Sequence, residues 1–140
     1  MQKILLLILL TLLGSWLPAQ AADAEKEKPA ATEDNYAYYG FEPEIVTNYI
    51  SNRKKLGFVR ISVELMVKDP QDLLAIQHHD PLLRAAIVEI LGDQTEDKIK
   101  SLTGREEIRK ECYETVNRLL QQETGKALVV NLLFTRYLYD

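Results

Sequence analysis

The sequence contains a single cysteine, Cys112, among its 140 residues. One cysteine cannot form an intrachain disulfide, and it cannot supply the several thiolates of a structural zinc site. Positive charge is also scarce, since 17 Lys and Arg residues face 21 Asp and Glu residues and the formal net charge is −4. Proteins that bind nucleic acid neutralise phosphates with an excess of basic side chains, so that class is not expected here. The length leaves room for one compact domain.

Residues 1–21 have the layout of a secretory signal peptide. Lys3 gives a short positive start, residues 4–13 form an apolar run, and small residues lead to Ala21 and Ala22. We expect cleavage after Ala21. The alternative is that the segment is retained as an anchor, although its apolar stretch is shorter than the roughly 20 residues that span a bilayer. In both cases the rest of the chain leaves the cytoplasm.

A charged segment follows at residues 22–35 and contains no large apolar side chain. Such a segment buries too little surface to offset the entropy lost on ordering, so we expect a flexible linker. One folded domain is then expected at residues 36–140. The predicted organisation is a signal peptide or anchor at 1–21, a linker at 22–35 and a single domain at 36–140.

Two strands are predicted at the start of the domain. An aromatic-rich stretch at 36–41 runs into the β-branched and aromatic residues 45–50, which favour a strand. Apolar side chains then alternate from Val59 to Val67, which is typical of a long strand with one buried face. The residues between these strands suit the loop of an antiparallel hairpin.

Helical patterns follow the long strand. Asp69-Pro70 and Asp80-Pro81 each combine a capping Asp with a Pro that suits the first turn, so we expect a short helix and then a second helix ending at Gly92. Thr95 is expected to begin another helical turn or two.

A long helix is predicted after this turn. Its start matches a capping box at Thr103–Glu106, and Gly125 is expected to end it. Its apolar stripe consists of Ile108, Cys112, Val116, Leu119 and Leu120.

The last predicted element is a strand at residues 127–139. It is apolar on both faces over 128–134, so we expect it in the centre of the sheet with both faces covered. The order of strands and helices predicts an α+β fold, with a small antiparallel sheet and helices packed on one side.

No pattern typical of a catalytic centre is present, so we expect no enzymatic activity, no cofactor and no metal. The only histidines, His78 and His79, are adjacent near an expected helix end. Consecutive helical side chains diverge by about 100°, so these two cannot readily share one metal ion. We interpret them as a solvated helix terminus, and a metal- or pH-responsive role is the alternative.

The cysteine and an acidic cluster each allow a structural and a functional interpretation. Cys112 lies on the apolar stripe, where a buried thiol is inert rather than nucleophilic. The cluster Asp93, Glu96 and Asp97 resembles a calcium loop, but Lys98 stands where glycine is needed and Gly104 where the bidentate Glu would be. We therefore favour packing for Cys112 and no calcium site.

An aromatic cluster and a basic loop complete the candidates. Aromatic side chains at Tyr36, Tyr38, Tyr39 and Phe41 could stack on a ligand, but we expect them to fill the core or protect a sheet edge. The run at 53–55, Arg-Lys-Lys, could contact anionic lipid, and a solvated hairpin loop is the preferred interpretation. Association with other protein chains through sheet edges and helix faces is then the expected mode of action.

Several segments carry a family resemblance through their order and spacing. They are Tyr39–Pro43, Ile45–Asn48, Val59–Leu65, Asp80–Val88, Leu102–Arg109, Val116-Asn117 and Val129–Tyr137. Together they resemble FliL, the bacterial flagellar basal-body-associated protein family, over residues 39–140.

This resemblance implies a periplasmic domain at the inner membrane, similar to the stomatin-like (SPFH) fold. It further implies self-association into rings around the flagellar stator units, and a non-enzymatic role in motility and chemotaxis. The family supplies no catalytic residues, and the resemblance does not place the contact residues. The signal-like segment 1–21 departs from the transmembrane helix with which such proteins usually begin. The alternative is therefore a soluble periplasmic adapter that serves a non-flagellar partner in the envelope.

Overall fold

The computed structural model describes residues 35–52 and 55–140. The predicted signal peptide with its cleavage point at Ala21 and Ala22, the linker up to residue 34, and residues 53–54 of the basic loop lie outside the described residues.

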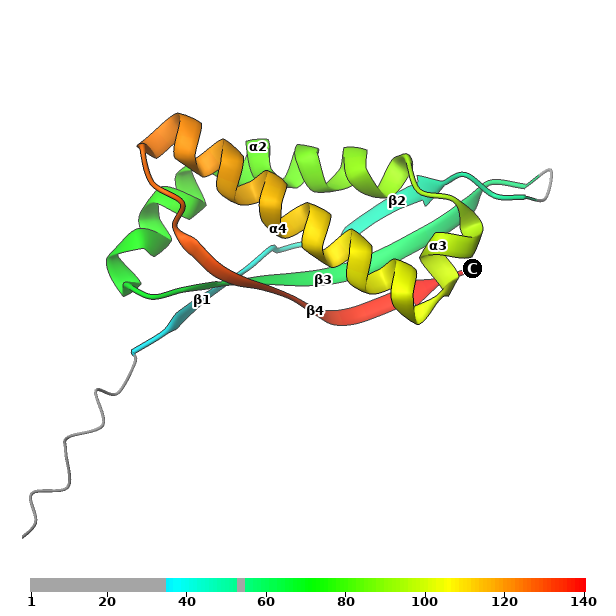
Figure 1. Cartoon of the computed structure of the whole chain (residues 1–140), viewed down its shortest axis with the longest axis horizontal. Coiled ribbons are helices and arrows are strands. Elements are labelled where there is room, and N and C mark those ends of the chain that lie inside the picture. Colours follow the sequence, from blue (N-terminus) through cyan, green and yellow to red (C-terminus); the bar gives the residue numbers. More distant parts are fainter. Residues whose placement is uncertain (1–34, 53–54) are drawn as a thin grey trace, which may run out of the picture. The chain divides into compact units, whose positions relative to one another are not determined.

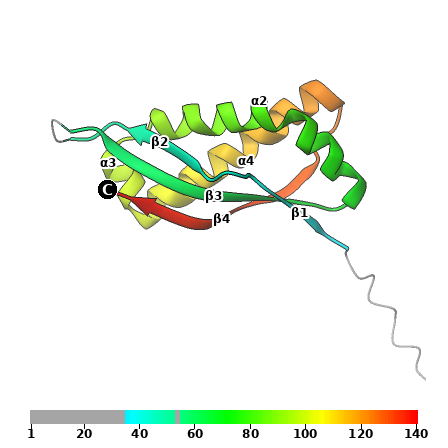
Figure 2. The ribbon, with the colours of Figure 1, turned by 180° about the vertical axis from the view of Figure 1, so that it is seen from behind.

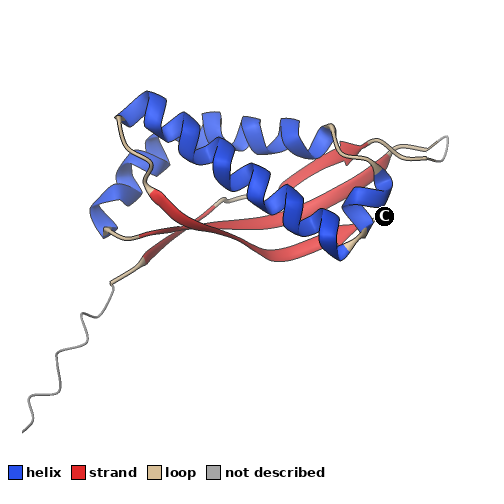
Figure 3. Ribbon diagram, in the orientation of Figure 1, coloured by secondary structure: helices blue, strands red, loops and turns tan. Residues whose placement is uncertain are grey.

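The described elements follow the order strand, strand, strand, helices, strand (Figure 1). They are β1 (Ala37–Gly40), β2 (Ile45–Tyr49), β3 (Gly57–Val67), the 3-10 turn η1 (Pro70–Asp72), α2 (Leu73–Gly92), α3 (Glu96–Lys100), α4 (Leu102–Thr124) and β4 (Val129–Tyr139). Figure 3 shows these helices on one face of the sheet. The predicted α+β class with an antiparallel sheet and helices on one side is confirmed.

The central strand of the sheet is β3. Strands β2 and β1 pair with one of its sides, β2 with Gly57–Ile61 and β1 with Glu64–Val67, and β4 pairs along the other side. All three pairings are antiparallel. The predicted hairpin of β2 and β3 is confirmed. The aromatic stretch at 36–41 forms a separate strand instead of joining β2, because the intervening Pro43 has no N–H for a ladder.

The prediction that the last strand is central is wrong, because β4 lies at the edge. Its apolar character on both faces has two origins. Leu132 is fully buried beneath the helices, whereas Val130 and Leu138, on the opposite face, are 44% and 51% exposed. The described chain therefore covers only one of the two apolar faces of β4.

The predicted pair of helices at 69–92 is a single α-helix after a short 3-10 turn. Asp69 caps η1 as expected, since its carboxylate accepts a hydrogen bond from the Gln71 N–H. The prediction that Asp80-Pro81 begins a second helix is wrong, because Pro81 stands inside α2. Proline inside a helix removes one hydrogen bond and commonly bends the axis, and α2 changes direction along its length (Figures 1 and 2).

The start of α4 also differs from the prediction. Ser101, and not Thr103, caps the helix, and its hydroxyl accepts a hydrogen bond of 3.0 Å from the Gly104 N–H. Glu106 forms an ion pair with Arg109 instead of closing a capping box. The predicted helix start at Thr95 and the helix end at Gly125, where φ is 80°, are both confirmed.

The core lies between the helices and the inner face of β3. The alternating residues Val59 to Val67 on that face are fully buried or nearly so, and they pack against the apolar stripes of α2 and α4. Cys112 is fully buried within this core. Burial raises the pKa of its thiol to about 12, so the thiol stays protonated and unreactive at neutral pH. The packing interpretation of Cys112 is confirmed.

Candidate interaction surface

The outer face of the sheet, opposite the helices, has a polar centre. Glu44 accepts hydrogen bonds from the Ser62 hydroxyl at 2.5 Å and from the Arg136 guanidinium at 2.8 Å, and Arg60 lies 4.0 Å away. The hydrogen bond from Ser62, followed by the charges of Arg136 and Arg60, lowers the pKa of Glu44. The carboxylate therefore stays ionised and ties β3 and β4 to the start of β2.

Apolar side chains flank this polar centre at both ends of the outer face. One end carries Val46, Phe58 and Leu138, and the other end carries Tyr38 and Val130, all exposed. Exposed apolar side chains rimmed by charges are a common feature of protein contact surfaces. No helix or strand of the described residues covers this face (Figure 2).

Helix α4 covers the outer edge of the first half of β4. The Asn117 side chain donates to the Val129 carbonyl at 2.7 Å and accepts from the Val129 N–H at 2.9 Å. Arg109 donates to the Leu132 carbonyl at 3.0 Å, and Arg105 donates to the Phe134 carbonyl at 3.4 Å.

These donors stand at multiples of four residues along α4 and so share one side of the helix. They occupy the hydrogen-bonding positions that a neighbouring strand would otherwise take. Arg105 also lies 4.9 Å above the Tyr137 ring, which holds its guanidinium against the strand.

The second half of β4 has an open edge. The Asp140 N–H donates to the Phe58 carbonyl at 3.1 Å. Hydrogen bonding alternates along an antiparallel pair, so Tyr137 and Tyr139 direct their backbone N–H and C=O groups away from β3. Within residues 35–52 and 55–140 no backbone or side chain bonds to these groups.

A second cluster joins β1 and the turn that follows it to α2. The Tyr39 hydroxyl donates to Asp80 at 2.6 Å, and Arg84 donates to the carbonyls of Pro43 and Glu42 at 2.6 and 3.1 Å. Burial, and then the hydrogen bond to Asp80, raises the pKa of Tyr39 to about 12.

The aromatic side chains of this cluster divide between packing and exposure. Phe41 is buried, with the Tyr39 ring 5.5 Å away and the Arg84 guanidinium 5.4 Å from its centre. Tyr38 is exposed on the outer face. The prediction that these aromatics fill the core or protect a sheet edge is confirmed for Tyr39 and Phe41, which pack in or against the core, and not for Tyr38, which is 52% exposed.

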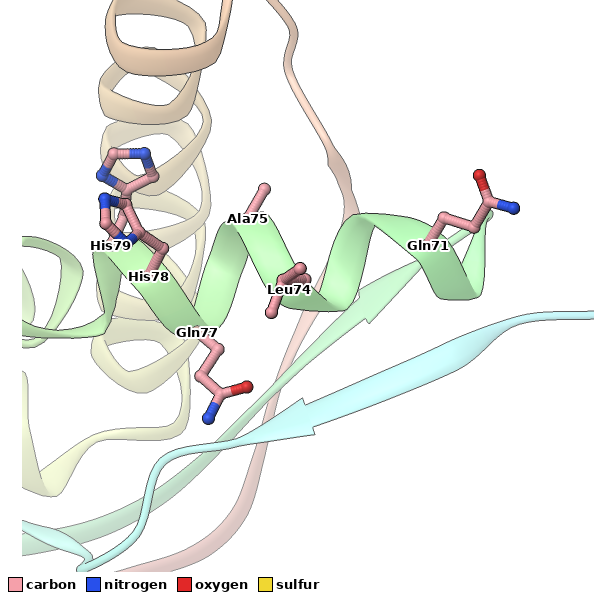
Figure 4. Close-up of a pocket in the computed structure, with 6 residues that line it drawn as sticks. All are labelled: Gln71, Leu74, Ala75, Gln77, His78 and His79. Carbon is pink, nitrogen blue, oxygen red and sulfur yellow. The ribbon is translucent and has the colours of Figure 1, made fainter.

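The histidines lie inside α2, so the prediction of a helix terminus is wrong, because the helix continues past Asp80. Figure 4 shows the two imidazoles side by side at one end of a shallow pocket that is also lined by Leu74. Their ring centres are 4.9 Å apart. In the part of the chain that the structure describes, no group of three or more His, Cys, Asp or Glu residues could hold a metal ion.

The acidic cluster contains a buried brace. The Glu96 carboxylate accepts hydrogen bonds from Lys100 Nζ at 2.8 Å, the Asn52 N–H at 2.9 Å and the Ser51 hydroxyl at 3.1 Å. The bond from Lys100, and next that from Asn52, lowers the pKa of Glu96 to about 2. Glu96 therefore fixes the chain after β2 to α3, beside the bridge between Ile50 and Thr95.

We expect Glu96→Gln to lower the Tm of the full chain at neutral pH. The folded-state pKa lies below the ordinary value of 4.5, so this carboxylate stabilises the fold above about pH 4.5, and the contribution is lost as the pH falls toward 2. The Tm difference between the wild type and the variant should therefore shrink over that range. Thermal melts by circular dichroism measure it, with the exposed Glu89→Gln as a matched control. A Tm difference that does not change with pH would contradict the brace.

Comparison with known proteins identifies the family. Residues 38–139 match the family described as "Flagellar basal body-associated protein FliL". The chain belongs to the FliL family. A curated relative, "Flagellar protein FliL" of Aquifex aeolicus (strain VF5), is 31% identical over 99 residues, which cover 71% of this chain. The match spans 58% of that relative's length.

The family assignment places the chain among flagellar basal-body-associated proteins, and it confirms the resemblance seen in the sequence. The segments that carry the resemblance also meet in space. Tyr39–Pro43 contacts Asp80–Val88 through Arg84, and Leu102–Arg109 with Val116-Asn117 contacts Val129–Tyr137 along the edge of β4. Of the helices formed by the described residues, none is long and apolar enough to cross a bilayer.

Proposed function

We propose that this FliL-family chain is a non-enzymatic accessory protein of the flagellar basal body that self-associates and supports stator function in motility and chemotaxis. The family match over residues 38–139 carries the proposal. The surface supports it, because exposed apolar side chains and an open strand edge suit association with other chains.

The proposed location is the periplasm, at or near the inner membrane, with stator or basal-body proteins as partners. Residues 1–21 act as a signal peptide cleaved after Ala21, or as an anchor, and residues 22–35 link this segment to the FliL domain at 36–140. The domain adopts a stomatin-like fold in this proposal. Mass spectrometry of the amino terminus in membrane and soluble fractions tests the location, and an uncleaved chain in the cytosol would contradict it.

Deleting the gene in the source bacterium is expected to reduce swimming in soft agar and swarming on hard agar. In this proposal the deletion removes a protein contact that supports the stator, so flagella should still assemble but drive movement less effectively. Spreading diameter and single-cell speed measure the effect, and restoring the wild-type chain is the control. Unchanged spreading on both kinds of agar would count against a flagellar role and favour the adapter alternative.

A further inference from the structure

The edges of the sheet differ in how the described residues protect them. Asn117, Arg109 and Arg105 cover β4 from Val129 to Phe134. The end of β2 is covered where Ile50 exchanges backbone hydrogen bonds with Gln94 and Glu96. Open edges of this kind are usually blocked by charges, prolines or covering elements, because they pair readily with other strands. The stretch at Tyr137 and Tyr139 has no such cover within the described residues.

A second open stretch lies on β1. The Phe41 N–H donates to the Val63 carbonyl at 3.1 Å, so the alternation places the backbone groups of Tyr38 and Gly40 away from β3. Within the described residues these groups have no hydrogen-bond partner. Gly40 carries no side chain, and an added Cβ would make one ordinary contact, with Glu64 Cγ at 3.9 Å.

The two open stretches cannot pair within one molecule. Strand β1 pairs with Glu64–Val67 on one side of β3, whereas Tyr137–Tyr139 pairs with Val59–Ile61 on the other side. They therefore lie at opposite ends and on opposite edges of the sheet. A contact between two different patches of the same protein is heterologous, and it can propagate from copy to copy.

We propose that β1 of one copy pairs with the open half of β4 of the next copy, a contact that rests on the self-association in the proposed function. Both strands run antiparallel to β3, so copies in the same orientation pair them as parallel strands. In a parallel pair, the N–H and C=O of one residue bond to two residues of the neighbouring strand that are two positions apart, and the first residue lies opposite the residue between them. Tyr38 then bonds to Tyr137 and Tyr139 and lies opposite Leu138.

The side chains agree with this register. On β3, Met66 and Arg60 point away from the core. Tyr38 is paired with Met66 and Leu138 with Arg60, so Tyr38 and Leu138 also point to the uncovered outer face. The pairing would bury Tyr38 against Leu138, which are 52% and 51% exposed. Gly40 would face Asp140, where a small residue lets the chains approach. A short strand pair buries less than the roughly 800 Å² per partner of a stable interface, so a weak, concentration-dependent contact is expected.

Cross-linking of engineered cysteines tests the pairing on the purified full chain. Tyr38→Cys and Leu138→Cys are prepared with tags of different size and treated with a short bismaleimide, separately and mixed. The native Cys112 is fully buried and stays unreactive. We expect a cross-link between the two tags in the mixture, and in each variant alone no more than the exposed Arg118→Cys control gives.

A matched pair of variants tests the backbone contact. Tyr139→Pro removes the outward N–H without breaking a bond to β3, whereas Tyr139→Ala removes the ring and keeps the N–H. We expect the mixed cross-link to fall roughly twofold to tenfold more with Pro than with Ala, the range for one hydrogen bond. Circular dichroism melts exclude unfolding as the cause.

Two results would overturn the proposal. If the mixture of the two cysteine variants gives no more cross-linked product than the Arg118→Cys control, the strands do not pair. If one variant alone gives as much cross-linked product as the mixture, two copies meet through the same residue in a twofold contact instead. Neither result touches the flagellar role, which the deletion strain measures independently.

Discussion

Replacing Gly104 with alanine is expected to destabilise the full chain by roughly 2–4 kcal/mol, from overpacking together with loss of the Ser101 cap. A Cβ at this position would lie 2.0 Å from the Lys98 carbonyl oxygen and 2.6 Å from Ser101 Oγ. Backbone cannot rotate away as a flexible side chain can, so α3 must move off the first turn of α4. That movement would also disturb the buried Ile99 and the Glu96 brace.

Urea denaturation followed by circular dichroism measures the effect on the free energy of unfolding. Gly40→Ala is the matched control, because its Cβ would meet only Glu64 Cγ at 3.9 Å, an ordinary contact. Equal stability of the two alanine variants would show that α3 and α4 do not approach as closely as the structure indicates.

The sequence predicts the core better than it predicts the sheet order. Alternation of apolar side chains from Val59 to Val67 identifies the buried face of β3, because successive side chains of a strand point to opposite faces. The continuous apolar run at 128–134 does not show which face of the strand is buried. It combines a face buried beneath the helices with a face left exposed, and a strand with two apolar faces looks the same whether the second face is covered or free. Whether β4 is a central or an edge strand depends on which other strands pair with it, and the sequence of β4 alone does not show this.

The second helix shows how tertiary contacts override a local signal. Asp80-Pro81 is a good helix start by composition, yet the Asp80 carboxylate accepts hydrogen bonds from Tyr39 and Arg84 instead of capping. The cost of a proline inside a helix, about 3 kcal/mol, is offset by packing of the residues on both sides of it, including the fully buried Ile76 and Leu83.

The residues that cover the edge of β4 could not be assigned from the sequence. Arg105, Arg109 and Asn117 bond to backbone atoms of residues that follow them by 12 to 29 positions. Side-chain types give no information about backbone acceptors, so the pattern is visible only once β4 is placed. The available signal was the spacing of these polar residues by multiples of four, on a side of α4 that is only half exposed.

Removing the Asn117 amide is expected to cost the full chain roughly 2–4 kcal/mol, because Asn117→Ala leaves both the N–H and the carbonyl of the buried Val129 without partners. The exposed Gln122→Ala, on the same helix, should change stability by no more than about 0.5 kcal/mol. Urea denaturation at neutral pH compares the two variants. Similar losses in both would show that the amide does not replace a neighbouring strand.

The isosteric variant Asn117→Asp separates the two hydrogen bonds. At neutral pH its carboxylate still accepts from the Val129 N–H, but its second oxygen faces the Val129 carbonyl and repels it. A protonated carboxyl group donates to that carbonyl, so folding favours the protonated form and raises the pKa of Asp at this position above its unfolded value of about 3.9. The stability lost at neutral pH should then return as the pH falls through the folded-state pKa, whereas Asn117→Ala should show no recovery relative to the wild type. If both variants respond to pH alike, the bond from the Asn117 amide to the Val129 carbonyl contributes nothing to the stability of the fold.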